Sequence, residues 1–91
     1  MTKRQVTLIA KALADPRRFE ILECIARCSR ETSCSDLRDK FPITAATLSH
    51  HLKELSNAGL ITARRDSKFV YLQLKQDVWD GYLKHLAKLG R

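Results

Sequence analysis

The spacing of apolar residues separates this chain into helical and extended segments. Up to residue 59, apolar residues recur every three or four positions, which predicts helices over residues 4–14, about 16–28, about 34–40 and 44–59. After Gly59 they alternate, which predicts strands over residues 60–65 and 68–74. The helical spacing returns at Gln76 and continues to residue 91. The pattern therefore predicts a mainly α domain with one small β-hairpin, in the order α-α-α-α-β-β-α.

Capping and turn residues support these limits. Asp15 and Pro16 separate the first two helices, because Asp accepts hydrogen bonds from free helical amides and Pro suits the first helical position. Pro42 ends the short third helix, and Thr44 can cap the next one. The intervening turn has the length found in a helix-turn-helix, which would occupy residues 34–59. In the second helix we expect four apolar residues to be buried: Phe19, Leu22, Ile25 and Ala26.

The helix over residues 44–59 has a leucine stripe on one side and short polar side chains on the other. At about 100° per residue, Leu48, Leu52 and Leu55 share the stripe, and His51 lies about 60° from it, so we expect His51 to be partly buried. The opposite side and its flanks hold Ala46, Thr47, Ser49, His50, Lys53 and Asn57. Small hydrogen-bonding side chains on an exposed helix suit insertion into the DNA major groove. An ordinary amphipathic surface helix would have the same leucine stripe.

Residues 60–74 form the predicted hairpin, with three cations near its turn. Val70, Leu72 and Leu74 fall on one face, opposite Phe69, Tyr71 and Gln73. Arg64, Arg65 and Lys68 are expected at the tip. A basic hairpin directly after a base-reading helix indicates a winged helix, in which the wing contacts the DNA backbone near the minor groove. A solvated hairpin end is the alternative interpretation of these three residues.

The charge of the chain favours a polyanionic partner. The 91 residues suit a single domain over 1–91, and 17 Lys and Arg against 10 Asp and Glu give a net charge of +7. Residues 1–30 and 61–91 each have a net charge of +4, whereas residues 31–60 have −1, so flanking elements must supply most phosphate contacts. We expect no membrane span, no signal peptide and no enzyme, since long apolar runs and glycine-rich phosphate loops are absent from the sequence.

The last helix has an apolar stripe that a small core is not expected to cover. Pairing of this helix (76–91) with the first (1–14) across a two-fold axis predicts a homodimer. The proposed interface residues are Val6, Ile9, Leu13, Trp79, Tyr82, Leu83 and Leu86. The competing interpretation is that the last helix packs only on its own core.

Three segments together resemble the ArsR/SmtB family of winged-helix repressors. They are Leu13-Ala-Asp-Pro-x-Arg18, then Ser49-x-His-Leu-x2-Leu-x2-Ala-Gly-Leu60, then the hairpin from Arg64-Arg65 to Tyr71. The resemblance implies a homodimer joined through its first and last helices, which binds an imperfect palindrome and releases it when an inducer binds. It also implies that Thr47, Ser49 and His50 reach base edges.

The inducer sites of this family are not matched. Thiol-using relatives have Cys-x-Cys followed by Asp, where this chain has Ser33-Cys34-Ser35-Asp36. Relatives that bind zinc on the last helix have Asp-x-His, where this chain has Asp77-Val78-Trp79, and His85 has no spaced partner. We therefore expect no metal and no cofactor.

Three cysteines remain as candidates for a signal. Cys24 and Cys28 share one helical face, and Cys34 begins the next helix, where the helix dipole can lower the pKa of a thiol. They could be small buried hydrophobes, a thiol redox sensor or a three-thiolate site for a soft ion. An odd number of cysteines without export features favours reduced thiols in the cytoplasm.

These observations predict a homodimeric, sequence-specific transcriptional regulator that binds an inverted-repeat operator in double-stranded DNA and leaves it on an unidentified signal. Phosphate contacts would come from Lys53, Arg64, Arg65, Lys68 and the amides near Thr44, and base contacts from Ala46, Thr47, Ser49 and His50. An architectural or sequence-indifferent DNA-binding protein and a winged-helix protein-interaction module are the alternatives.

Overall fold

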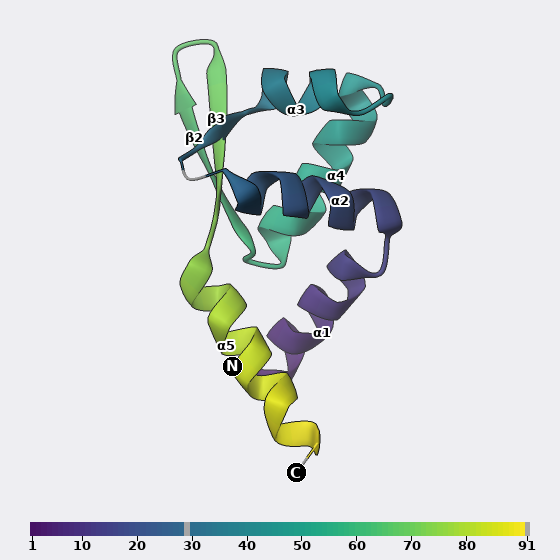
Figure 1. Cartoon of the computed structure of the whole chain (residues 1–91), viewed down its shortest axis with the longest axis vertical. Helices are drawn as coiled ribbons and strands as arrows, with labels where there is room; N and C mark the ends of the chain where they lie inside the picture. Colours follow the sequence, from purple (N-terminus) through teal and green to yellow (C-terminus); the bar gives the residue numbers. More distant parts are fainter. Residues whose placement is uncertain (29, 91) are drawn as a thin grey trace.

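The computed structural model describes residues 1–28 and 30–90, in which five α-helices surround a small antiparallel sheet (Figure 1). Ser29 and Arg91, the latter expected in the last helix, lie outside the described residues. The order is α1 (Lys3–Leu13), α2 (Pro16–Arg27), β1 (Thr32–Ser33), α3 (Cys34–Lys40), α4 (Ala45–Asn57), β2 (Ile61–Asp66), β3 (Phe69–Leu74), α5 (Gln76–Ala87) and a short 3-10 turn (Lys88–Gly90). This confirms the predicted winged helix-turn-helix, in which α3 and α4 are the helix-turn-helix and β2 and β3 are the wing.

The sheet contains one strand that the sequence pattern did not predict. The strand order is β1-β3-β2, with Thr32 and Ser33 of β1 opposite Leu72 and Tyr71 of β3. A strand of two polar residues is too short to show an alternating pattern, so its pairing with β3 could not be recognised from the sequence. Its effect is to attach the wing to the chain segment that precedes α3.

Side-chain caps begin the helices at the predicted places. The Asp15 carboxylate accepts the amide hydrogen of Arg18 at 3.0 Å, which also holds the pKa of Asp15 below its ordinary value. Thr44 accepts the amide hydrogen of Thr47 at 3.1 Å. At the other end of α4, Gly59 has φ of +79°, a conformation that favours glycine and turns the chain into the wing.

The core forms where α1, α2, α4 and the sheet meet. Its fully buried side chains include Ile9, Ile21, Ile25, Leu37, Leu55, Leu60 and Leu72. The predicted buried face of α2 was partly wrong, because Phe19 is 39% exposed and Ala26 is exposed, whereas Ile21 is fully buried. α2 packs against α1, α4 and β3, and the side chains of Ile21 and Ile25 are fully buried on the side that faces them. Phe19 and Ala26 instead border a small hollow that Trp79 of α5 also lines.

Helices α1 and α5 lie together at one end of an elongated molecule, with both termini beside them (Figure 1). The molecule measures 45 × 22 × 20 Å. Two of the proposed interface residues are instead buried within the subunit, Ile9 at 0% and Tyr82 at 6% exposure. They support α1 and α5 from inside the subunit, and their side chains have almost no area left for a partner to cover. Val6, Leu13 and Trp79 are half-buried, and Leu83 and Leu86 are exposed.

His51 is buried, as its angular position on α4 predicts, and it connects α4 to the start of α2. Its Nδ1 atom accepts a hydrogen bond from Nε of Arg18 at 3.3 Å, and Arg18 is the residue whose amide Asp15 binds. Burial lowers the pKa of His51, and the positive charges of Arg18, His50 and Arg17 act in the same direction, while the Asp15 carboxylate opposes them. The hydrogen bond requires an unprotonated Nδ1, so the geometry and the lowered pKa both favour neutral His51.

We expect the free energy of unfolding to fall as the pH is lowered from about 7 to about 5. Native His51 has a pKa below the ordinary 6.5, so the unfolded chain binds more protons in this range and stability rises with pH. The contribution of His51 is complete above pH 6.5 and is lost as the pH falls from that value through the native pKa. Urea unfolding of wild type and of His51→Gln at several pH values measures it. A decline that is equally steep in His51→Gln would contradict this role.

Candidate nucleic-acid interface

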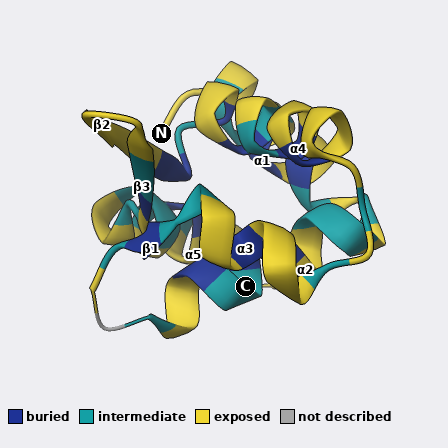
Figure 2. Ribbon diagram, turned by 90° about the horizontal axis from the view of Figure 1, so that it is seen from above, coloured by how far each residue is buried: buried dark blue, intermediate teal, exposed yellow. Residues whose placement is uncertain are grey.

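One face of α4 is exposed (Figure 2), and its side chains are mostly short and polar. The structure places every residue predicted to read bases on that face, where Ala46, Thr47, Ser49 and His50 are all exposed. Lys53 is exposed one turn further along α4. The opposite face is held in the core by Leu48 and Leu55. The helix is therefore fixed from behind and presents small hydrogen-bonding groups in front.

The first turn of α4 is ordered by its own hydroxyl groups. The hydroxyl of Thr44 donates to that of Thr47 at 2.9 Å and accepts the Thr47 amide hydrogen, so the Thr44 side chain serves as the cap. Thr44 therefore contributes the helix start and its amides to a phosphate contact more readily than its own hydroxyl.

The wing separates its two arginines onto opposite faces. Arg65 pairs with Val70, whose face lies over α4, whereas Arg64 pairs with Tyr71 on the outer face. The turn itself is formed by Ser67, at φ of +57°, and Lys68. The expectation that Arg64 lies at a freely cationic tip was wrong, because it is within β2 and forms an ion pair with Glu31 at 2.8 Å. Arg65 is the cation that the pleat of β2 places on the same face of the wing as Val70. Lys68 lies in the turn, where its ammonium is 5.6 Å from the centre of the Phe69 ring.

A groove of about 350 Å³ runs between α4 and the inner face of the wing. Ser49, Lys53 and Asn57 line it from α4, and Val70 lines it from the wing. Cys34, at the start of α3, closes one part of it. Helix α4 and the wing thus share one continuous surface.

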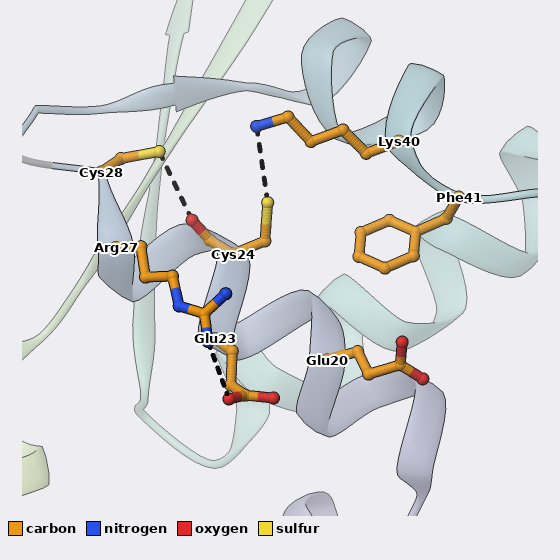
Figure 3. Close-up of a pocket in the computed structure, with 7 residues that line it drawn as sticks. All are labelled: Glu20, Glu23, Cys24, Arg27, Cys28, Lys40 and Phe41. Atoms are coloured by element: carbon orange, nitrogen blue, oxygen red, sulfur yellow. Dashed lines mark hydrogen bonds and ion pairs between the residues drawn. The ribbon is translucent and has the colours of Figure 1, made fainter.

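The three cysteines do not gather into one site. Cys24 and Cys28 border a second pocket of about 480 Å³, with Lys40 and Phe41 from the end of α3 on its other side (Figure 3). Cys34 faces the groove beside α4 instead. Among residues 1–28 and 30–90, no group of three His, Cys, Asp or Glu side chains is arranged to hold a metal ion. The three-thiolate alternative is therefore wrong.

The surroundings of the cysteines distinguish them. Burial raises the pKa of the Cys34 thiol, which corrects the expectation that the start of its helix would lower it. The Cys28 thiol donates to the Cys24 carbonyl oxygen at 3.4 Å. Cys24 differs from both, because the Lys40 ammonium lies 3.6 Å from its sulfur and the pocket is open beside it (Figure 3).

Sequence reasoning missed three residues that shape this surface. Arg18 anchors His51, Glu31 holds Arg64, and Lys40 contacts Cys24. Each contact joins residues at least 16 positions apart in the chain. No local spacing signals such contacts, because the partners meet only through packing and strand register. Within the described residues, no helix has both the length and the apolarity needed to cross a membrane.

Comparison with known proteins agrees with this geometry. A family model described as a helix-turn-helix domain matches residues 13–64. An uncharacterized HTH-type transcriptional regulator of Bacillus subtilis, YceK, is 37% identical over 75 residues, covering 82% of this chain and 75% of that protein. The arsenical resistance operon repressor of Staphylococcus aureus is 34% identical over 86 residues, covering 94% and 81% of the two chains.

A solved structure shares the fold as well as part of the sequence. The homodimeric winged helix-turn-helix DNA-binding domain of a candidate ArsR-family regulator from Mycobacterium bovis superposes with a TM-score of 0.76 at 27% identity, over 96% of this chain and 80% of that one. The fold, the exposed face of α4 and these relatives agree with one another. The chain belongs to the ArsR/SmtB family of winged helix-turn-helix transcriptional repressors.

Proposed function

We propose that this protein is a homodimer that represses transcription by binding an inverted-repeat operator and leaves it when a thiol is modified. The observation that carries the proposal is the groove that α4 and the inner face of the wing share, which Ser49 and Lys53 line from α4. His50 is exposed on the same helix, and Arg65 is exposed on the same face of the wing as Val70. Base edges are read by short polar groups in the major groove, and phosphates are bound by cations at its border. The net charge of +7 favours association with DNA in general.

The dimer is proposed from the apolar side of α5. Leu83 is 46% exposed, Leu86 36% and Leu89 74%, an arrangement that leaves large apolar side chains in water in the single chain. The Mycobacterium bovis relative with the same fold is homodimeric. Two copies joined at this end would place their α4 helices about 34 Å apart, one turn of duplex, which requires an inverted repeat.

His50→Ala should weaken binding to the specific site by about 1–3 kcal/mol and binding to random duplex much less. The reason is that an exposed imidazole on the reading face recognises bases, whereas backbone contacts are indifferent to sequence. Arg65→Ala should weaken binding to both duplexes. It should also reduce the slope of log affinity against log salt concentration by about one, which is the contribution of one phosphate contact. Fluorescence anisotropy on the two duplexes at several salt concentrations measures both variants.

Equal losses on the two duplexes for His50→Ala would remove His50 from base recognition. Wild-type affinity that does not change when the inverted repeat is scrambled would favour an architectural, sequence-indifferent protein instead.

Leu83→Glu should convert the dimer to monomers at micromolar concentration, because it would bury a charge in an apolar interface. Binding to a full inverted repeat should fall strongly, while binding to a single half-site changes little. Lys84→Gln is the matched control, since it also lowers the net charge by one but alters an exposed neighbour outside the apolar stripe. Sedimentation equilibrium measures the association, and a Leu83→Glu protein that remains dimeric would refute this interface.

The thiol signal is assigned to Cys24 because of its position. Lys40 and Phe41 line the opposite side of the open pocket beside it, and they directly precede the turn into α4. In the proposed reaction the Cys24 thiolate attacks one sulfur of a small disulfide and forms a mixed disulfide with it. The S–S bond of the reagent breaks, and its other half leaves as a thiolate that takes up the proton released by Cys24. The attached group would separate α2 from the end of α3 and displace the start of α4.

Treatment with hydroxyethyl disulfide should label Cys24 before the other two cysteines and lower operator affinity by about tenfold, a usual size for coupling between two sites. Peptide mapping locates the label, and anisotropy measures the affinity before and after reduction. Cys24→Ser should bind DNA normally and resist the reagent, while Cys34→Ser should respond as wild type does. Labelling of Cys34 first, or labelled Cys24 with unchanged affinity, would contradict the assignment.

A further inference from the structure

An ion pair crosses the whole sheet behind the wing. Glu31 immediately precedes β1, which lies on the opposite side of β3 from β2, yet its carboxylate reaches Arg64 in β2. Nε of Arg64 donates to the two carboxylate oxygens at 3.2 and 3.0 Å, and Nη2 donates at 2.8 Å. Two nitrogens of one guanidinium therefore grip both oxygens of one carboxylate, a geometry that fixes direction as well as distance.

Tyr71 completes this arrangement, and we call the three residues Glu31, Arg64 and Tyr71 the clamp. Tyr71 of β3 pairs with Ser33 of β1 on one side and with Arg64 of β2 on the other. The guanidinium carbon of Arg64 lies 4.8 Å from the centre of the Tyr71 ring. Arg64 thus stacks on Tyr71 of the middle strand β3 and is hydrogen-bonded to Glu31, which precedes β1. The clamp therefore joins the two edges of the sheet across β3.

The wing needs such support because most of it is a two-stranded ribbon. β1 pairs with β3 only at Thr32 and Ser33, so within the part of the chain that the structure describes no third strand lies beside the wing from Arg65 to Val70. A two-stranded hairpin is marginally stable by itself. Small rotations of the ribbon about its base would change where Arg65 and Lys68 lie relative to α4.

Glu31 and Arg64 are both charged, although their side chains remain partly exposed. The hydrogen bonds from Arg64 hold the pKa of Glu31 below its ordinary value, and Glu31 in turn raises the pKa of Arg64. Both groups are therefore ionised at neutral pH. Their side chains remain partly exposed, so the pair contributes modestly to global stability and acts mainly on the orientation of the wing.

We propose that Glu31 is a positioning residue for DNA binding, which holds the wing through Arg64 and Tyr71 at the angle that brings Arg65 and Lys68 to the phosphates. The inference rests on the proposed function only in taking α4 and the wing as the DNA-binding surface. An acidic side chain near a polyanion ordinarily opposes binding. Here the acid promotes it.

Glu31→Gln decides between these two effects. If Glu31 acts only through its charge, the substitution should tighten binding to duplex DNA. If Glu31 positions the wing, binding should weaken by about threefold, the size of effect that a partly exposed ion pair can exert. Asp39→Asn is the matched control, since it makes the same change of charge at an exposed position of α3 and should leave affinity unchanged or slightly increased.

Arg64→Lys provides a second test at constant charge. Lysine has no planar fork for the Glu31 carboxylate and stacks less well on Tyr71, so the clamp should loosen although the cation is retained. We expect an affinity loss similar to that of Glu31→Gln. An unchanged affinity would mean that Arg64 acts as an interchangeable phosphate contact, and the inference would be wrong.

A measurement without DNA separates positioning from general stability. Amide hydrogen exchange of residues 62–66 and 69–73 should become faster in Glu31→Gln, while the unfolding midpoint of the domain stays close to that of wild type. Unchanged exchange, or tighter DNA binding by Glu31→Gln, would overturn the role of Glu31 but leave the proposed function unaffected. Random-sequence duplex is used throughout, so a failure to find a preferred inverted repeat would affect the proposed function but not this result. Failure of the wild-type protein to bind any duplex would overturn both.

Discussion

The attachment of one face of α4 to the rest of the subunit is the constraint on which the DNA-binding surface depends. Leu48 and Leu55 bury that face, and His51 adds a directional contact to Arg18 at the start of α2. Apolar burial alone would allow the helix to rotate by a few degrees, whereas a hydrogen bond to a fixed guanidinium limits that rotation. The proposed contacts of single hydroxyl and imidazole groups with base edges would need this precision.

The wing follows a different principle of support. It has little core of its own, since its tip is an isolated ribbon, and its orientation depends on the strand register and on the contact of Arg64 with Glu31 and Tyr71. The division of its two arginines between the faces of the hairpin gives them separate tasks. One cation is used to hold the hairpin, and the other remains available to a ligand of α4.

The pocket at Cys24 is where the proposed thiol signal would act on this architecture. It lies between α2, which belongs to the core, and the end of α3, which leads into the turn before Thr44. The sequence lacks the ligand patterns of the metal sites of related repressors, and the described cysteines are divided between two surfaces. A chemical event at Cys24 would act on the entry to α4 directly, without a metal and without transmission through the dimer.

Much of this protein is determined by local sequence. The leucine spacing of α4, the caps at Asp15 and Thr44 and the alternation after Gly59 are properties of short segments, so they predict the helices, the hairpin and the exposed residues of α4 without knowledge of the fold. The family resemblance rests on the same segments. The positions of Ala46, Thr47, Ser49 and His50 on the exposed face follow from helical geometry alone.

The tertiary structure decided what depends on long-range contacts. Phe19 was expected inside and Ile21 is there instead, because the neighbours of α2 determine which part of a broad apolar face is covered. Arg64 and Arg65 are adjacent in sequence and equivalent in charge, but the pleat of β2 and the position of Glu31 give them opposite surroundings. A period in the sequence specifies which side chains share a face. Only the packing of distant segments specifies what that face meets.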